Sequence, residues 1–467
     1  MRDKRFLEKD QIREETSELF NGKKYNPGPV VYSSPDGEVR VDSSTRHIIT
    51  YGITGSGKTT SGSLTEAYNT IKAGKSLIAI DPKGQLLDVI GNHVPKNYRK
   101  IVIDLTDPKH SFRFNIFSYI TILLRSDKPE DKTIGFELLE STLDALFKES
   151  GIRLQDPFWD NSALNTTRAV FLALTTFLND VNPITLSNHI NGCVPMFHDE
   201  EDEDEPSFFR GSNIQTHLRK IERYIQGDDE VAIIAREGMS AALSNDLKVL
   251  RDIVSVINSH LTKFIGSGDM RKLHSGDDVN ISSFNGKTPC AVFIVIPIHT
   301  HAYDKLAGII CNQFAQQLFR AASQHPDNRL PTETTFLLEE FGTIGKTIPL
   351  ISELITAGRS YGIRIHLILQ SYSQLIDLFG PAMANTLASN CSTTIFFRTL
   401  DYETYLHYGR ICGMRQVDYG DHIENEPLIT QDSLSALKTH QALVLMDDKV
   451  FCSMLPFYTS LYPELKK

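Results

Sequence analysis

The residues whose types and spacing most clearly suggest chemistry lie in the stretch ITYGITGSGKTTSG, residues 49–62. It contains a complete phosphate-loop motif that ends in Lys58 and Thr59. In such a loop, glycines permit a tight turn, and backbone N–H groups at the start of the following helix face the phosphates of a nucleotide. The stretch follows a predicted strand and opens a predicted helix, which is the context that the motif requires. We therefore expect a nucleotide to bind here.

The residue types in the loop have separate expected tasks. Lys58 should reach the β- and γ-phosphates, and the Thr59 hydroxyl should bind Mg²⁺. The residues expected to contact the nucleotide directly in this stretch are Gly52, Thr54, Gly55, Ser56, Gly57, Lys58, Thr59 and Thr60. The predicted ligands are thus ATP and Mg²⁺.

A pair of acidic residues would complete a hydrolysis site. The stretch TTFLLEEFGTIG places Glu339 and Glu340 directly after a short apolar run. Ligands of open α/β sheets sit at the carboxyl ends of the strands. The first carboxylate would hold the Mg²⁺ shell and the second would polarise the attacking water. The alternative is two solvated glutamates after an edge strand.

Two further polar residues are candidates for the same chemistry. Gln370 follows the apolar run of HLILQS, where a side chain can contact the γ-phosphate or its water, or can instead cap the next helix. Arg359, in TAGRSYG, lies just before that run. It could complete the site of an adjacent subunit by stabilising charge on the transferred phosphoryl group, or form a surface ion pair.

The elements that must position these residues form an alternating pattern. Short β-branched and apolar runs that alternate with helical segments imply an α/β fold, with a mainly parallel sheet and helices on both faces. The expected strands are at 46–52, 76–84 (ending in a polar loop), 100–105, 289–297, 334–340, 362–370, 392–397 and 441–446. The interval 126–284 has helical periodicity instead, and we expect it to be an inserted all-α domain.

Composition narrows the classes of protein. The 467-residue chain has a net charge of −10, so it is not uniformly basic, although a groove can still be locally basic. Six scattered cysteines without a Cys-x-x-Cys pair argue against a zinc site or a disulfide framework. No apolar run of membrane-spanning length and no apolar leader occurs. Seven consecutive carboxylates at 199–205 are expected to form a solvated loop, or an acidic contact for a basic partner.

The start of the chain is charged, with spaced apolar residues. We expect residues 1–24 to form a helical extension, either packed on the body through one stripe or docked on a partner. Residues 26–42 are expected to form a loop that leads into a small hairpin.

Several stretches, in this order, resemble the coupling ATPases of type IV secretion and conjugation, the TraG/TraD-like family. The resemblance covers about residues 45–460. The most similar run is FLLEEFGTIGKTIPLISELITAGRSYGIRIHLILQSYSQLIDLFG, and further stretches are SLIAIDPKGQLLD, VIDLTDPKHSFRFNIFSYI, DPFWDNSALNTTRAVFLAL, VFIVIPIHTHAYDKLAGIICNQFAQQLFRAA and EPLITQDSLSALKTHQALVLM.

The resemblance implies a RecA-like motor that acts as a hexamer and couples ATP hydrolysis to moving DNA. It implies a nucleotide-binding domain of residues 25–125 plus 285–467 and an all-α domain of 126–284 that helps to select the substrate. On matching positions, Glu340 is the catalytic glutamate, Gln370 the glutamine after the strand and Arg359 the trans-acting arginine. Arg46 matches a further arginine near the nucleotide.

Two departures from the family pattern affect these expectations. The family usually has Asp where this chain has Glu339, which leaves open how fast hydrolysis runs and which glutamate does which task. Family members usually begin with transmembrane helices, whereas about 45 polar residues precede the core here. Either an anchor was removed or the chain is a naturally soluble member, and the initial Met1 favours the second.

The main hypothesis is a Mg²⁺-dependent ATPase that delivers DNA or DNA–relaxase complexes to a type IV secretion channel. Its expected partners are DNA bound without sequence preference, a relaxase, the channel ATPase and a membrane-anchoring protein. It is expected in the cytoplasm, recruited to the inner face of the membrane, as a hexamer or as a monomer in isolation. The alternatives are an adaptor that uses nucleotide as a switch while recruiting proteins, and a FtsK- or HerA-like DNA pump outside secretion.

Overall fold

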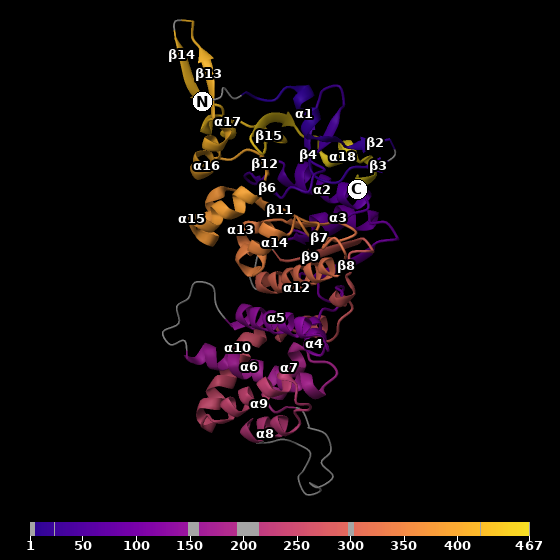
Figure 1. Ribbon diagram of the computed structural model, residues 1–467, viewed down its shortest axis with the longest axis vertical. Helices are drawn as coiled ribbons and strands as arrows, with labels where there is room; N and C mark the ends of the chain where they lie inside the picture. Colours follow the sequence, from indigo (N-terminus) through magenta and orange to yellow (C-terminus); the bar gives the residue numbers. More distant parts are fainter. Residues whose placement is uncertain are drawn as a thin grey trace. The chain divides into compact units, whose positions relative to one another are not determined.

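The structure is a computed structural model that describes residues 5–22, 24–147, 158–193, 214–297, 303–420 and 422–466. The chain divides into two compact units (Figure 1). The first comprises Met1–Thr106 and Phe284–Lys467, and the second comprises Asp107–Ser283. The run of carboxylates at 199–205 lies outside the described residues.

A nine-stranded sheet forms the centre of the described part of the first unit. Its strands are, in spatial order, β16 (Lys449–Met454), β15 (Gln441–Met446), β12 (Thr393–Phe396), β6 (Ile48–Tyr51), β11 (Ile363–Leu369), β10 (Thr334–Leu338), β7 (Ser76–Asp81), β9 (Cys290–Val295) and β8 (Arg99–Asp104). The strands from β12 to β8 pair in parallel, whereas β15 and β16 extend the β12 edge as an antiparallel hairpin. The mainly parallel sheet predicted from the sequence is confirmed.

Both faces of this sheet are buried, which explains the unbroken apolar runs of its strands. Leu77 and Ala79 of β7 belong to a core that includes residues of α2 and α3. Their neighbours Ile78 and Ile80 point to the other face and are equally buried. The helices of this unit are α1 (Lys9–Glu15), α2 (Leu64–Lys72), α3 (Gln85–Ile90), α12 (Asp304–Ser323), α13 (Phe341–Ile344), α14 (Ile351–Ala357), α15 (Tyr372–Asn390), α16 (Tyr402–Cys412), α17 (Gln431–Ser435) and α18 (Tyr458–Leu461).

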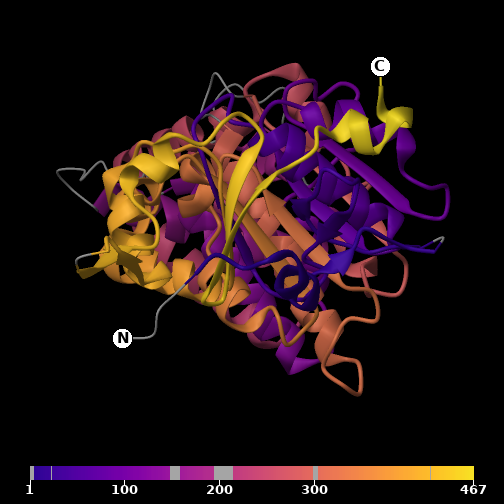
Figure 2. The same cartoon turned by 90° about the horizontal axis from the view of Figure 1, so that it is seen from above.

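Smaller sheets flank the large one. β4 (Val30–Ser33) and β5 (Val39–Val41) form the hairpin expected within 26–42, and β1 (Ser17–Glu18) pairs with β5. β2 (Phe20–Asn21) pairs with β3 (Lys24–Tyr25), and β13 (Met414–Asp418) pairs with β14 (Ile423–Pro427). Figure 2 shows the yellow C-terminal strands against the indigo N-terminal segment, where the Ser33 amide donates to Ser453 Oγ at 2.9 Å.

Within residues 5–22 and 24, which the structure describes, only α1 is helical, so the helical extension expected over residues 1–24 is wrong for the rest of these residues. The helix ends at Glu15 because the Arg40 guanidinium binds the Arg13 carbonyl at 2.8 Å and also the Thr16 carbonyl. Those carbonyls would otherwise accept the hydrogen bonds of the next helical turn. The chain then continues as short strands, and Leu19 is buried in the core of the sheet domain.

The second unit is helical over its described residues. Its helices are α4 (Ser118–Leu124), α5 (Pro129–Phe147), α6 (Phe158–Phe177), α7 (Pro183–Ile190), α8 (Ile214–Arg223), α9 (Glu230–Leu243), α10 (Leu247–Ile265) and α11 (Gly268–His274). The chain leaves the first unit after Thr106 rather than after residue 125, where we expected the boundary. The reason is that residues 107–125 bond to the helical unit: Phe114 N donates to Leu273 O at 2.8 Å, and the Asn115 side chain donates to Val181 O at 2.9 Å.

No helix in the described ranges is long and apolar enough to span a membrane.

A buried polar network joins α2 to the sheet. Glu66 on α2 pairs with His366 Nδ1 and lies 3.7 Å from Arg364, both on β11. The His366 Nε2 atom is 2.7 Å from the Thr50 hydroxyl on β6. All four side chains are buried. Burial alone would raise the pKa of Glu66, but His366 and Arg364 hold it below its ordinary value, so Glu66 is a buried anion that needs its partners.

We expect Glu66→Gln to lower the free energy of unfolding by about 3 kcal/mol, since removing one partner of a buried pair leaves the other charges uncompensated. Urea unfolding followed by circular dichroism measures the change. The matched control is Glu333→Gln, because Glu333 pairs with Arg329 at 2.6 Å where both side chains are about one-third exposed. That variant should lose less than about 1 kcal/mol. Equal losses in the two variants would contradict a structural role for the buried network.

Candidate functional site

The parallel pairing brings the predicted phosphate loop and acidic pair to one edge of the sheet. β6, β11, β10 and β7 are neighbours that point the same way, so the residues that follow them lie at the same edge. A cavity of about 340 Å³ opens there. Its lining residues are Thr54, Gly55, Gly57, Lys58, Thr59, Thr60, Lys83, Gln85, Glu340, Thr439, His440 and Phe457. A small adjoining cavity is lined by Thr59, Asp81, Pro82, Lys83, Gln85, Glu339 and Glu340.

The turn of the loop depends on glycine at two positions. Gly57 has a φ of 109°, in the left-handed region, and it precedes a π-helical segment, Lys58–Ser63, that leads into α2. A Cβ atom at Gly57 would lie 2.8 Å from His440 Nδ1, and one at Gly52 would lie 2.7 Å from the Phe397 Cβ atom. Any larger residue at either position would push the loop off these neighbours.

Lys58 points back into its own loop. Its ammonium donates to the carbonyls of Gly52 and, at 3.1 Å, Ile53, and the side chain is buried. Burial lowers the pKa of Lys58, while the charges of Glu340 and Glu339 oppose that shift. A buried cation that, within the described part of the chain, donates to two neutral carbonyls fits an anionic ligand, because phosphate oxygens make stronger charge-assisted bonds.

The two glutamates occupy different surroundings. Glu339 is buried, and its Oε1 atom has no hydrogen-bond partner among the described residues. Burial, together with the charges of Asp81 and Glu340, raises its pKa. Glu340 lines both cavities, and its Oε1 atom lies 3.5 Å from Lys83 Nζ. Its backbone has a φ of 49°, a strained conformation that is common at functional sites.

Asp81 belongs to this site, although we did not single it out from the sequence. It ends β7 and accepts hydrogen bonds from the backbone N–H groups of Gln85 and Leu87, each at 3.0 Å. Burial raises its pKa to about 6, against the opposing effect of those N–H groups. Asp81, Glu339 and the Thr59 hydroxyl are oxygen groups around one small cavity, a donor set that suits a hard cation such as Mg²⁺.

The structure separates the other predicted residues from the cavity. Gln370 follows β11, between the loop and the glutamates, but its side chain is not among those that line the cavity. Its backbone N–H donates to Gln374 Oε1 at 2.9 Å. Arg359 precedes β11 and therefore lies at the opposite edge of the sheet, where its carbonyl accepts from Arg329 at 3.1 Å. Arg359 cannot reach the cavity of its own chain.

Arg46 also lies at the far edge, because it precedes β6 while the loop follows it. Its guanidinium pairs with Asp447 at 2.9 Å and lies 4.0 Å from Glu15. We expected Arg46 beside the nucleotide, and the structure instead gives it contacts that join α1 to the β15–β16 hairpin.

A third wall of the cavity has no local motif in the sequence. Thr439, His440 and Phe457 come from the C-terminal part of the chain. The His440 amide donates to Ser56 O at 3.0 Å, and its Nδ1 atom is 2.8 Å from the Ser61 hydroxyl. These contacts join residues almost 380 positions apart, so no local pattern could have revealed them.

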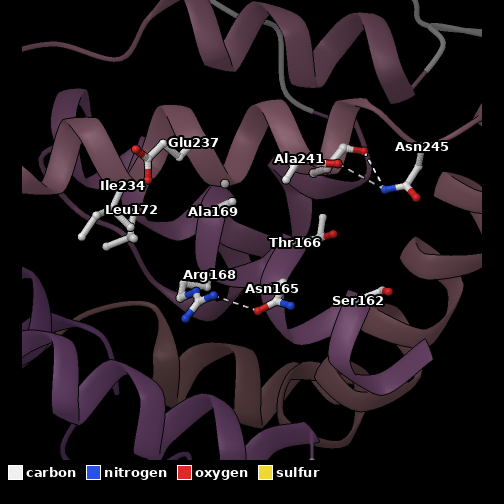
Figure 3. Close-up of a pocket in the computed structure, with 12 residues that line it drawn as sticks. Ser162, Asn165, Thr166, Arg168, Ala169, Leu172, Ile234, Glu237, Ala241 and Asn245 are labelled. Atoms are coloured by element: carbon white, nitrogen blue, oxygen red, sulfur yellow. Dashed lines mark hydrogen bonds between the residues drawn. The ribbon is translucent and has the colours of Figure 1, made fainter. Parts of the chain in front are cut away.

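A second cavity, of about 410 Å³, lies between α6 and α9 in the helical unit (Figure 3). Its wall carries small residues such as Ala169 and Gly238. The guanidinium of Arg168 bonds to Asn165 at 2.8 Å and to Glu140 at 2.7 Å, so its charge is already paired within the unit.

Comparison with known proteins places these features in a family. A family described as "Type IV secretory system Conjugative DNA transfer" matches residues 3–450. Protein VirD4 of Agrobacterium fabrum is 24% identical over 43% of this chain and 32% of its own length, and TraG of Rhizobium radiobacter is 23% identical over 80% and 53%. The chain thus spans about a quarter to a half of the length of the curated relatives that it matches.

Solved structures share the fold. The coupling protein TrwBΔN70 superposes with a TM-score of 0.65 at 15% identity, over 98% of this chain and 93% of that one. A TrwB complex with ADP and Mg²⁺ gives a TM-score of 0.64, over 98% and 94% of the two chains at 15% identity. VirB4 of Thermoanaerobacter pseudethanolicus gives 0.53 at 12% identity, over 95% and 100%. These matches confirm the RecA-like nucleotide-binding fold.

The raised pKa of Asp81 predicts a pH-dependent stability. Between pH 4 and 6 the folded chain holds a proton on Asp81 that the unfolded chain releases, so the stability contributed at this position falls as pH rises. A shift from 3.8 to about 6 corresponds to about 3 kcal/mol. We expect the stability difference between wild type and Asp81→Asn to change by about that amount in favour of the variant from pH 4 to pH 7, in urea unfolding at each pH. A pH-independent difference would contradict the raised pKa.

Proposed function

Because the chain belongs to the type IV secretory system conjugative DNA-transfer family, we propose that it is a coupling ATPase that uses ATP hydrolysis to deliver DNA, or DNA–relaxase complexes, to a type IV secretion channel. The observation that carries the proposal is the cavity that joins a phosphate loop to two strand-end glutamates. The proposed cargo follows from the names of relatives, which are a type IV secretion system-coupling protein and a conjugal transfer protein.

In the proposed reaction, Lys58 exchanges the carbonyls of Gly52 and Ile53 for the β- and γ-phosphate oxygens of ATP. The N–H groups at the start of the π-helical segment and α2 face the same phosphates. Glu340, which lines the larger cavity, orients the water that attacks the γ-phosphorus and accepts its proton. The bond from that phosphorus to the β–γ bridging oxygen breaks, and ADP and phosphate leave.

Mg²⁺ fits beside this set. The Thr59 hydroxyl and Glu339 would hold it, the latter through water, and when bound it would neutralise charge on the phosphates. The unpartnered Oε1 atom of Glu339 is the feature of this chain that fits such a cation. This arrangement assigns the two glutamates separate tasks: Glu339 serves the metal and Glu340 serves the water.

Arg359 fits the site of a neighbouring copy. Arg359 lies at the sheet edge opposite its own cavity, where the amino ends of the parallel strands are. In a ring in which this edge of one subunit faces the cavity of the next, Arg359 would reach the transferred phosphoryl group. We propose a homohexamer on this ground. The ring would act at the inner face of the cell membrane, brought to the channel ATPase by a membrane-anchoring protein, and would contact DNA through phosphate charge without sequence preference.

ATP turnover with and without single- and double-stranded DNA, at several salt concentrations, tests the proposal. Wild type should hydrolyse ATP faster with DNA, most strongly at low salt. Lys58→Ala should lose ATP binding by about 10- to 100-fold, the worth of a charge-assisted contact. Glu340→Gln should bind ATP normally and turn over about 10²- to 10⁴-fold more slowly, the usual contribution of a general base.

Equilibrium binding of ATP separates the two variants and serves as the folding control for Glu340→Gln, while circular dichroism serves as the folding control for Lys58→Ala. Unchanged turnover in Glu340→Gln would show that this carboxylate is not the base. Conjugative transfer that survives both substitutions would favour the recruiting adaptor over the motor.

Mixing of variant subunits tests the placement of Arg359. Arg359→Ala and Glu340→Gln should each be inactive alone. In mixed rings, an intact Glu340 on one subunit meets an intact Arg359 on its neighbour, so turnover should return to a substantial fraction of the wild-type rate. If the mixture stays as inactive as its parts while the subunits co-assemble, Arg359 does not act across an interface.

A further inference from the structure

We propose that Phe457 and His440 form the subsite for the base of the nucleotide, with the Phe457 ring as a stacking platform for a purine. This inference rests on the proposed function, because it requires a nucleotide whose phosphates occupy the loop. Neither residue belongs to the phosphate-loop motif or to the acidic pair, and both reach the cavity from the C-terminal part of the chain.

The two aromatic residues lie on the side of the loop away from the hydrolysis chemistry. The small cavity that holds Asp81 and Glu339 is lined by Thr59 but by neither His440 nor Phe457. His440 instead contacts Ser56 and Ser61, and it directly precedes β15, which lies on the opposite side of β6 from β10 and β7. A nucleotide with its γ-phosphate at Glu340 must extend away from the glutamates, and the remaining cavity wall in that direction is formed by Thr439, His440 and Phe457.

The Phe457 ring has the accessibility that stacking needs. It is 37% exposed while lining the cavity, although large apolar side chains of this unit are mostly buried. The Phe457 and His440 rings form a T-shaped pair with centroids 5.7 Å apart and an interplanar angle of 88°, and the Phe457 ring is tilted by 32° against Tyr458, with centroids 4.7 Å apart. A ring that neighbours hold in place at low entropy cost is a good partner for a flat base.

Backbone contacts fix this platform to the phosphate loop. His440 has a φ of 67°, a strained value for a residue with a side chain. Its amide donates to Ser56 O at 3.0 Å, and its carbonyl accepts from Leu455 N at 2.8 Å, two residues before Phe457. The base and phosphate subsites are thus parts of one rigid assembly, so binding at one is oriented for binding at the other.

The chemistry of this wall predicts which nucleotides bind. The polar side chains Lys83, Gln85 and Glu340 belong to the phosphate side of the cavity. On the base side, the polar groups are the Thr439 hydroxyl and the His440 ring, whose Nδ1 atom is already engaged with Ser61. Stacking grows with ring area, so we expect purines to bind better than pyrimidines, with little choice between adenine and guanine.

Calorimetric titration of the full chain with ATP, GTP, CTP and inorganic triphosphate, each with Mg²⁺, tests the subsite. Phe457→Ala should weaken ATP and GTP about tenfold, or about 1.4 kcal/mol. It should leave inorganic triphosphate unchanged, because that ligand has no base. Phe457→Tyr should keep the wild-type affinities. Phe20→Ala is the matched control, since Phe20 is a similarly exposed phenylalanine of the same unit that does not line the cavity, and it should change none of the affinities.

The outcomes separate this inference from the proposed function. If triphosphate and ATP bind and Phe457→Ala leaves ATP unchanged, the subsite is overturned while the phosphate site stands. If Phe457→Ala weakens triphosphate as much as ATP, the residue supports the loop and the stacking role is overturned. If wild type binds neither ligand, the proposed function fails, and the subsite fails with it.

Discussion

The parallel alignment of four neighbouring strands is the constraint on which the site depends. Tyr51 of β6 is level with Leu369 of β11, while Leu338 of β10 pairs with both Leu367 of β11 and Ile80 of β7. Adjacent strands lie about 4.8 Å apart, so the phosphate loop and the acidic pair, with β11 between them, are held about 10 Å apart. That gap is wide enough for a phosphate chain and narrow enough for both sides to contact it. No loop conformation has to supply this spacing, because hydrogen bonding between the strands fixes it.

One imidazole then attaches both ends of the loop to the central strand. His366 on β11 contacts Thr50, two residues before Gly52, and Glu66, on the helix that follows the loop. The network is buried, and the free-energy cost of removing its charges from water can exceed the attraction between them. Arg364 reinforces it from the same strand. Because the network contacts residues on both sides of the phosphate loop, we expect it to hold the loop rigid. It is less suited to raising the free energy of unfolding, since apolar residues of equal volume would pack there at lower cost.

The parts of the site that the sequence revealed are those with local signatures. The phosphate loop has a fixed spacing, and Glu339 and Glu340 end an apolar run, so both could be placed at one sheet edge from strand polarity alone. The same polarity places Arg46 and Arg359, which precede their strands, at the opposite edge. The expectation that Arg46 lies beside the nucleotide came from the family resemblance and not from strand polarity. His440 and Phe457 were not predictable, since their contacts depend on how the C-terminal hairpin adds to the β12 edge. The helical extension failed for a similar reason: Arg40, from a hairpin further along the chain, takes the carbonyls that a longer α1 would need.

Glu339, at the position where the resemblance to the coupling ATPases led us to expect aspartate, becomes understandable from its neighbours. Asp81 is fixed beside it by two backbone N–H groups and acts as a charge that, with burial, raises the pKa of Glu339. A carboxyl that is buried, has a raised pKa and is left with one unpartnered oxygen among the described residues costs the folded chain stability. A divalent cation reverses each of these effects, since it favours the ionised form and provides the missing partner. Protonation and cation binding therefore compete for Glu339, whose side chain is about 1.5 Å longer than that of aspartate and lines the same small cavity as Thr59.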